Sequence, residues 1–174
     1  MKEKLGASPI LFPMPAVLIG TYRDDGAANA MTAAWAAACC AKPPCLGVAV
    51  RDSRLTYQTL RSRRAFTVCV PPAALVREVD YLGIVSGKRA PDKLERVGLK
   101  SERGSEVDAP VLLGCPVVAE CELRGELELG SHTWFAGEVK QVQVDRELLR
   151  EDGTIDVERL DPLGYATSER VYRR

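Results

Sequence analysis

Two long stretches in the second half of the chain alternate between apolar and polar residues, and this alternation constrains the fold more than any other feature. They are "CPVVAECELRGELELG" (115–130) and "HTWFAGEVKQVQVD" (132–145). A period of two residues places successive side chains on opposite faces, as in a β-strand. A tight connection containing Gly130 separates the stretches. The sequence therefore predicts a long β-hairpin, and a barrel or sandwich rather than a doubly wound parallel sheet.

Shorter elements are predicted on either side of this hairpin. Short apolar runs indicate strands at 15–22, 45–51 and 65–72, the first followed by the turn residues "RDDG". Helices are predicted at 53–66, with Ser53 as N-cap, and at 72–87, where Leu75, Val79 and Leu82 share one face. A polar loop leads into a short helix within 86–99, and the polar tail has a turn at Asp152-Gly153.

The run "GAANAMTAAWAAACCAKPP" (26–44) raises a conflict between composition and pattern. Its many alanines favour a helix, because Ala has the highest helix propensity. However, Asn29, Thr32 and a Cys-Cys pair interrupt the run, and two prolines end it. Composition alone predicts a helix here.

The length of 174 residues suits one domain, 1–174, with a substantial hydrophobic core. With 24 basic and 24 acidic residues the net charge is zero, so no field favours nucleic acid or an anionic membrane. No apolar run is long enough to span a membrane, and Pro9, Pro13 and Pro15 break any signal-peptide core. The expected location is the cytoplasm.

The cysteines fit a reducing compartment and no metal site is expected. No pair has CxxC spacing, and the chain has one histidine. Cys69 and Cys121 lie in predicted strands as small apolar residues. A redox role for Cys39, Cys40 or Cys45, for example as a Cys39–Cys45 pair, stays open.

Several common cofactor motifs are missing, but three segments together suit a phosphate and a flat ring. There is no GxGxxG, GxxxxGK[ST] or GxSxG sequence. The segment "RDSRLT" (51–56) supplies hydroxyls, a cation and the start of a predicted helix, and "SGKRAPDK" (86–93) adds lysines and Arg89. The small residues of 29–34 let a flat ring approach the backbone. Each motif alone also has a plainer explanation, such as a helix cap or a solvated basic loop.

In this order, the segments resemble the flavin reductase-like or flavoredoxin family. The resemblance is carried by "VLIGT", "DDGAANAMTAAW", "KPPCLGVAVRDSRLTYQTL", "AFTVCVPP", "SGKRAPDK" and "ECELRGELELGSHTWFAGEV", from about residue 10 to residue 165. It implies a mainly β protein with short helices: a six-stranded antiparallel Greek-key split barrel, usually a homodimer, that binds FMN non-covalently. The alanine run would then be extended and lie along the flavin ring.

The resemblance also assigns expected roles to residues. The residues expected to contact FMN are Asn29, Ala30, Met31, Thr32, Ala33, Ala34, Ser53, Arg54, Leu55, Thr56, Ser86, Gly87, Lys88, Lys93 and Tyr165. Lys93 is favoured over Lys88 for the phosphate by its family position. His132 is the one candidate catalytic residue, near the reactive face of the flavin, with a solvated turn histidine as the alternative. Trp35 and Trp134 are expected in the core or a dimer interface.

The resulting functional hypothesis is an FMN-binding oxidoreductase that passes hydride from NADH or NADPH to FMN. The cofactor would do the chemistry while the protein positions it. The alternative is a flavoredoxin-type electron carrier without NAD(P)H activity, which works with a redox partner protein. A third hypothesis is a binding module whose barrel holds another ligand or none.

Overall fold

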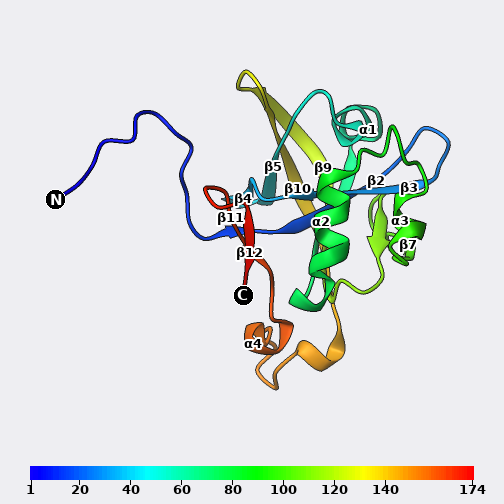
Figure 1. The fold of residues 1–174 in the computed structure, drawn as a ribbon. Coiled ribbons are helices and arrows are strands. Elements are labelled where there is room, and N and C mark those ends of the chain that lie inside the picture. The colour runs from blue at the N-terminus through cyan, green and yellow to red at the C-terminus, as the bar shows by residue number, and fades with distance from the viewer.

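The predicted long hairpin is the centre of the fold in the computed structural model, which describes residues 1–174 (Figure 1). β9 (Val117–Glu128) and β10 (Thr133–Val144) pair antiparallel along their lengths. Two irregularities in the register, at Ala136/Gly137 and Val139/Gln141, bend the ribbon. The prediction of a mainly β protein with short helices is confirmed.

The main sheet has seven strands, one more than the resemblance implied, because the alanine run contributes two of them. In addition to the hairpin it contains β2 (Val17–Tyr22), β3 (Ala28–Ala33), β4 (Ala36–Ala41), β5 (Pro44–Val50) and β6 (Ala65–Val70). Their order is β3-β2-β6-β9-β10-β5-β4, with all pairs antiparallel. The expected strands at 15–22, 45–51 and 65–72 are thus present, and the last ends before Pro71.

The two edge strands of this sheet are consecutive in the chain. Only Ala34 and Trp35 join β3 at one edge to β4 at the other. Three chain steps span at most about 10 Å, so the edges must lie close together and the sheet must curl into a barrel. The Trp35 carbonyl accepts a hydrogen bond from Ala49 N–H at 2.9 Å, which holds the joint against β5.

The alanine run is extended rather than helical, as the family resemblance implied and contrary to the helix predicted from composition. The tertiary structure overrides propensity here because small side chains allow close packing against a helix. A Cβ on Gly83 of α2 (Val76–Ile84) would lie 3.3 Å from the Cβ of Thr32 on β3. The first half of the run, β3, therefore approaches α2 closely, whereas the second half, β4, is mostly exposed at the other edge of the sheet.

Three helices stand near the predicted positions. α1 (Leu55–Arg63) lies within 53–66, and α2 follows a 3-10 turn, η1 (Ala73–Leu75), within 72–87. α3 (Lys93–Arg96) follows the polar loop. The expected N-cap was wrong: Arg54 is the N-cap of α1, no side chain caps it, and Ser53 is exposed. The chain turns into the helix one residue later than the Ser pattern indicated.

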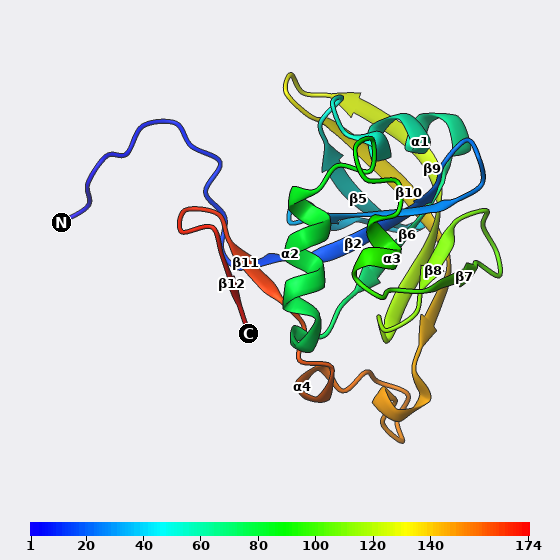
Figure 2. The same ribbon diagram turned by 45° about the vertical axis from the view of Figure 1, so that its right-hand side comes forward.

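The tail carries more structure than the sequence indicated. The turn predicted at Asp152-Gly153 is present, between η2 (Arg146–Leu148) and α4 (Val157–Leu160). β11 (Gly164–Ala166) and β12 (Val171–Arg173) then form a three-stranded sheet with β1 (Met14–Pro15), beside α2 (Figure 2). A separate pair joins β7 (Ser101–Arg103) to β8 (Pro110–Leu112). Strands this short are too brief to show alternation.

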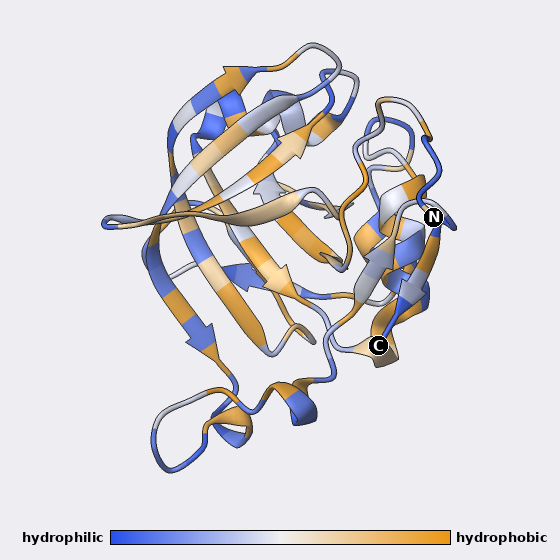
Figure 3. Cartoon of the chain, turned by 90° about the vertical axis from the view of Figure 1, so that its left-hand side faces the viewer, coloured by the Kyte–Doolittle hydropathy of each residue, from blue (hydrophilic) through white to orange (hydrophobic).

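Hydrophobic residues fill two adjoining cores, and orange and blue alternate along the strands in Figure 3. One core lies inside the barrel and includes Leu60, Phe66 and Phe135. The other lies under α2 and includes Leu18, Val79 and Leu82. Cys69 and Cys121 are buried in these cores, as predicted. None of the helices combines the length and apolar character needed to cross a bilayer.

Candidate functional site

A groove lined by the predicted cofactor residues runs along β3. Because β3 is an edge strand, alternate backbone N–H and C=O groups on its outer side have no partner strand. These groups can therefore bond a ligand laid along the strand. The helices α1, α2 and α3 all approach this strand, and three hollows adjoin one another along it.

The first hollow, which we call the cradle, is built from segments far apart in the sequence. β3 contributes Asn29 and Met31, the start of α1 contributes residues 54–56, and the end of α2 with the loop after it contributes residues 82–87. Its lining residues are Asn29, Met31, Arg54, Leu55, Thr56, Leu82, Val85, Ser86, Gly87 and Lys93. The fold thus brings together eight of the residues predicted to contact the cofactor.

Close contacts fix the walls of the cradle. The Asn29 amide donates to the Thr56 hydroxyl at 3.2 Å, which ties β3 to the first turn of α1. Gly87 lies against both, since a Cβ there would sit 2.4 Å from Asn29 Oδ1 and 2.9 Å from Leu55 Cδ2. Only glycine fits between these groups. The backbone of the 86–87 loop therefore reaches the cradle without a side chain intervening.

Lys93 is an uncompensated cation buried in the cradle wall. It is 3% exposed, and its Nζ donates to the carbonyls of Leu82 at 3.3 Å and Val85 at 3.1 Å. No carboxylate lies within 4.0 Å of Lys93 or Arg54. Burial, and to a lesser degree the Arg54 charge, lower the pKa of Lys93 to about 8. A buried charge without a counterion is destabilised, so this cradle favours an anion.

The N-terminus of α1 adds to the same positive field. Its first turn contains no acidic residue, while its last turn holds Arg61 and Arg63. The first backbone N–H groups of a helix have no partner within the helix, and the helix dipole is positive at that end. The capping residue Arg54 makes no capping bond, so these donors stay free for a ligand. Two cations and a helix terminus thus converge on one point.

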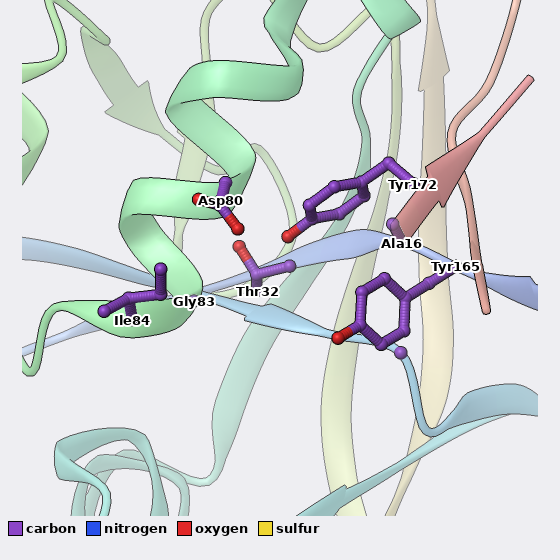
Figure 4. Close-up of a pocket in the computed structure, with 8 residues that line it drawn as sticks. Ala16, Thr32, Asp80, Gly83, Ile84, Tyr165 and Tyr172 are labelled. Atoms are coloured by element: carbon purple, nitrogen blue, oxygen red, sulfur yellow. The ribbon is translucent and has the colours of Figure 1, made fainter. Parts of the chain in front are cut away.

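The second hollow, of about 220 Å³, lies between β3, α2 and the tail strands (Figure 4). Tyr172 points from β12 toward Thr32 and Asp80, and Tyr165 projects from β11 into the same hollow with its hydroxyl turned away from Asp80. The Thr32 hydroxyl donates to the Val79 carbonyl, which fixes its position against α2. Burial, and then the adjacent Asp80 carboxylate, raise the pKa of Tyr172, so its hydroxyl stays protonated.

The third hollow, of about 210 Å³, contains the only histidine. His132 packs on Trp35 with ring centroids 4.7 Å apart, and Arg51 Nε donates to His132 Nε2 at 3.2 Å. Since arginine only donates, Nε2 is the acceptor and Nδ1 carries the proton, 2.9 Å from Ser131 Oγ. Burial, and then the Arg51 charge, lower the pKa of His132. The neutral form of His132 is therefore favoured, and the half-exposed ring is held by Trp35 and Arg51 at the end of the turn between β9 and β10.

The hollows share residues and so form one groove. Met31 and Arg54 line the cradle and the third hollow, whereas Thr32, Ala34 and Tyr165 line the second and the third. Ala33 also faces the third.

Three of the predicted contact residues lie elsewhere. Ser53 and Lys88 are exposed and line none of the three hollows, and the Ala30 side chain is buried in the core under α2. Sequence reasoning missed Arg51, Asp80 and Tyr172 as groove residues. Arg51 begins the "RDSRLT" segment, which was one signal that could have identified it. Trp134, expected in a core or an interface, is half-buried and lies over Gly47.

Comparisons with known proteins identify the family of this chain. The family profile described as "Flavin reductase like domain" matches residues 10–173. The structure is similar to flavoredoxin of Desulfovibrio vulgaris (Miyazaki F), with 41% identity, a TM-score of 0.94, and coverage of 99% of this chain and 92% of that chain. It is also similar to a flavoredoxin from Methanosarcina acetivorans, with 28% identity, a TM-score of 0.91, and coverage of 99% and 90%. These similarities confirm the split-barrel fold.

A relative among curated proteins has no described function. An uncharacterised protein of Aeropyrum pernix is 33% identical over 133 residues, which is 76% of this chain. The match spans 50% of the length of that relative, so the chain corresponds to only half of it.

Proposed function

This chain belongs to the flavin reductase-like domain family, and from that premise we propose that it binds FMN non-covalently in the groove along β3. We infer that it works as a flavoredoxin-type electron carrier with a redox partner protein. When bound, FMN would supply reversible transfer of one or two electrons. The observation that carries the proposal is the buried, unpaired Lys93 beside Arg54 and the start of α1.

The groups that line the cradle, a small hollow of about 10 Å³, match the chemistry of a phosphate placed at its mouth. A phosphate requires cations, hydroxyl donors and free backbone N–H groups, and the cradle has Lys93 and Arg54, the Thr56 and Ser86 hydroxyls, and the first turn of α1. Lys93 Nζ uses two of its three donors on carbonyls, so one remains for the ligand. Arriving phosphate would supply the counterion that Lys93 lacks.

The rest of the groove fits the isoalloxazine ring. Thr32 and the alanines at 33–34 leave the backbone of the strand accessible, and its edge groups would bond the polar side of the ring. Tyr165 and Tyr172 bound the groove on the tail side, and Trp35 with His132 bounds it on the side of β10. The proton on His132 Nδ1 is held toward Ser131, so in this arrangement Nε2 can bind a proton only if Arg51 moves away.

We favour the electron carrier over the NAD(P)H-dependent reductase, which was the main hypothesis from the sequence. The 41% identity to a flavoredoxin over nearly the whole chain supports this order. The reductase remains a second candidate because one observation favours it. Arg51, at the third hollow, has no carboxylate partner and could meet an anionic pyridine nucleotide.

FMN binding is tested with the purified chain freed of flavin. Titration with FMN, followed by the quenching of flavin fluorescence, should show one FMN per chain. Lys93→Met and Arg54→Ala should each weaken FMN binding by about 1.5–3 kcal/mol, since each removes a charge-assisted contact. Lys88→Met is the matched control, because Lys88 is exposed and outside the cradle.

Riboflavin separates the phosphate from the ring. It lacks the phosphate, so its affinity should be the same in the Lys93→Met variant and the parent. Equal losses of FMN affinity in the Lys88 and Lys93 variants would contradict the phosphate assignment. No uptake of FMN by the parent protein would refute the flavin proposal altogether.

The two candidate activities are separated by mixing the FMN-loaded protein with NADH and with NADPH under anaerobic conditions. An electron carrier should keep its flavin absorbance with both nucleotides and lose it with a strong chemical reductant such as dithionite. Loss of flavin absorbance after mixing with either nucleotide would overturn the carrier proposal in favour of the reductase.

We also propose that the protein is a homodimer, as the resemblance implies. The N-terminal arm supports an association, because Ile10, Leu11 and Phe12 are exposed, and the arm extends away from the barrel (Figure 1). Exposed apolar side chains gathered in one segment are typical of a surface that a partner covers. Light scattering of the purified protein measures the mass directly.

A further inference from the structure

The β4–β5 hairpin places two cysteines opposite each other. Cys40 on β4 and Cys45 on β5 are Cα partners in the antiparallel register, beside the Ala41–Pro44 pair that closes the hairpin. Directly opposite residues in antiparallel strands lie about 4.5–5.5 Å apart between Cα atoms. A disulfide needs about 4.4–6.8 Å. Paired residues also project to the same face of the sheet, so the backbone need not move far to join the two sulfurs.

The register distinguishes Cys40 from its neighbour Cys39. A bulge lies between Ala38 and Cys40, so Cys39 is the extra residue with no partner on β5. The spacing in the sequence alone left a Cys39–Cys45 redox pair open. The strand pairing favours Cys40 instead.

The two thiols differ in access, which suits a stepwise exchange. Cys40 is exposed on an edge strand, while Cys45 is buried and its Sγ donates to the Pro43 carbonyl at 3.4 Å. The other buried thiols, Cys69, Cys115 and Cys121, lie in the core. A small oxidant can therefore reach Cys40 first, and Cys45 lies behind it.

We propose that Cys40 and Cys45 form a reversible cross-strand disulfide, with a low-molecular-weight disulfide as the oxidant. The Cys40 thiolate attacks one sulfur of the oxidant, whose S–S bond breaks, and the departing thiolate takes the proton that Cys40 released. The Cys45 sulfur then attacks the Cys40 sulfur, and the second small thiol leaves with the Cys45 proton. Two protein thiols lose two electrons, and one small disulfide becomes two thiols.

The disulfide would link β4, an edge strand of the main sheet, to its neighbour β5. β4 begins directly after Trp35, which packs on His132. The disulfide would close a short ring across the hairpin and hold this edge against β5. In a reducing compartment such a bond is expected to be transient and to respond to the redox state. The proposal does not depend on FMN binding, since it uses only the register and the exposure of the two thiols.

The test uses the full chain treated with oxidised glutathione, then denatured, alkylated and digested with trypsin. Trypsin does not cut before proline, so Lys42-Pro43 stays intact and residues 24–51 form one peptide with all three thiols. We expect this peptide to be two hydrogens lighter across Cys40 and Cys45, and to carry one alkyl group, on Cys39. Dithiothreitol should restore three alkylated cysteines.

Matched variants define the pair. Cys39→Ser should form the link as the parent does, whereas Cys40→Ser, at an exposed position, should abolish the internal link without unfolding the protein. Three alkylated cysteines after oxidation, an alkyl group on Cys40 or Cys45 instead of Cys39, or chains joined by disulfides on a non-reducing gel would each overturn the proposal.

Discussion

At the scale of single residues, Lys93 is the most informative side chain in the protein. A lysine is almost never fully buried unless it is paired, and here its partners are two carbonyls. The sequence placed it in a polar loop, where a solvated lysine is the ordinary expectation. Its burial beside Arg54 turns that expectation into an anion-binding hypothesis.

The lowered pKa of Lys93 predicts two opposite pH dependences. The pKa of about 8 in the folded protein lies below the usual value of about 10.4, so between these values the unfolded chain binds more protons. The free energy of unfolding of FMN-free protein should therefore rise from pH 8 toward 10. FMN affinity should instead fall above pH 8, because the phosphate binds the ammonium form.

Calorimetry of FMN binding in two buffers with different ionisation enthalpies measures the proton uptake at pH 8–9. Lys93→Met should remove both the uptake and the loss of affinity. An affinity for FMN that stays constant from pH 7 to 9 in the parent would show that Lys93 does not meet the phosphate.

Gly87 supplies a second test at residue scale. Gly87→Ala places a Cβ 2.4 Å from Asn29 Oδ1 and should displace the wall of the cradle. We expect FMN affinity and stability to fall by about 1–3 kcal/mol each, as for other overpacked sites. Gly125→Ala is the control, since no atom lies within 4 Å of its Cβ. Equal FMN affinity in both variants, measured by fluorescence titration, would contradict a tight cradle.

At the scale of elements, Glu120 shows how a strand holds a loop. It is fully buried on β9, and it accepts bonds from the backbone N–H groups of Glu106 at 2.8 Å and Val107 at 3.1 Å. The Ser105 hydroxyl and the Gln143 amide also donate to it, each at 2.7 Å. Burial by itself would raise the pKa of Glu120, but these four bonds outweigh it and lower the pKa to about 2.

Glu120→Gln should therefore destabilise the protein at pH 7 by about 1–3 kcal/mol, the range for a broken buried hydrogen-bond set. The depressed pKa means that the Glu120 contribution is present above pH 4–5 and is lost as the pH falls toward 2. Urea unfolding at pH 7 and pH 3 should show that the variant loses less stability on acidification than the parent. Glu122→Gln, at an exposed neighbouring position, should behave like the parent. If the parent, Glu120→Gln and Glu122→Gln all lost the same stability on acidification, Glu120 would not be the source of this pH dependence.

At the scale of the whole molecule, the groove exists because the barrel closes. The chain passes from one sheet edge to the other through Ala34 and Trp35, which carries β3 past α2 and leads into β4 beside β5. The tail strands then return to cover the side of β3 near Tyr165. Residues of β3, β5, β11, β12, α1, α2 and α3 thus contribute to one binding surface, and its ligand should stabilise the whole fold.

FMN binding should raise the stability of the entire molecule. At an FMN concentration of about 100 times Kd, the gain is about 2.7 kcal/mol, which corresponds to about 5–10 °C in Tm for a chain of this size. Thermal unfolding followed by circular dichroism with and without FMN measures it. At the same FMN concentration, the shift should be smaller in Lys93→Met than in Lys88→Met. A Tm that does not respond to FMN would contradict binding to the folded barrel.

The sequence by itself determined the features that depend on local pattern. The alternating pattern predicted the hairpin of β9 and β10, and the spacing of apolar residues predicted α2. Side-chain periodicity indicates which faces of an element are buried. Two of the segments that contribute to the cradle, 51–56 and 86–93, were also readable, since hydroxyls and cations at a helix start or in a loop are a local signal.

Only the tertiary structure decided what depends on distant contacts. The alanine run became two edge strands because the curled sheet pairs β3 with β2 and β4 with β5, and packs β3 against α2. Helix propensity does not contain these long-range pairings. Asn29 meets Thr56 and Gly87, and Arg54 acts on Lys93, across 27 residues or more. Strand register, not spacing, placed Cys40 opposite Cys45. Contacts between segments so far apart follow from how the sheet curls, and a local pattern in the sequence carries no record of that curvature.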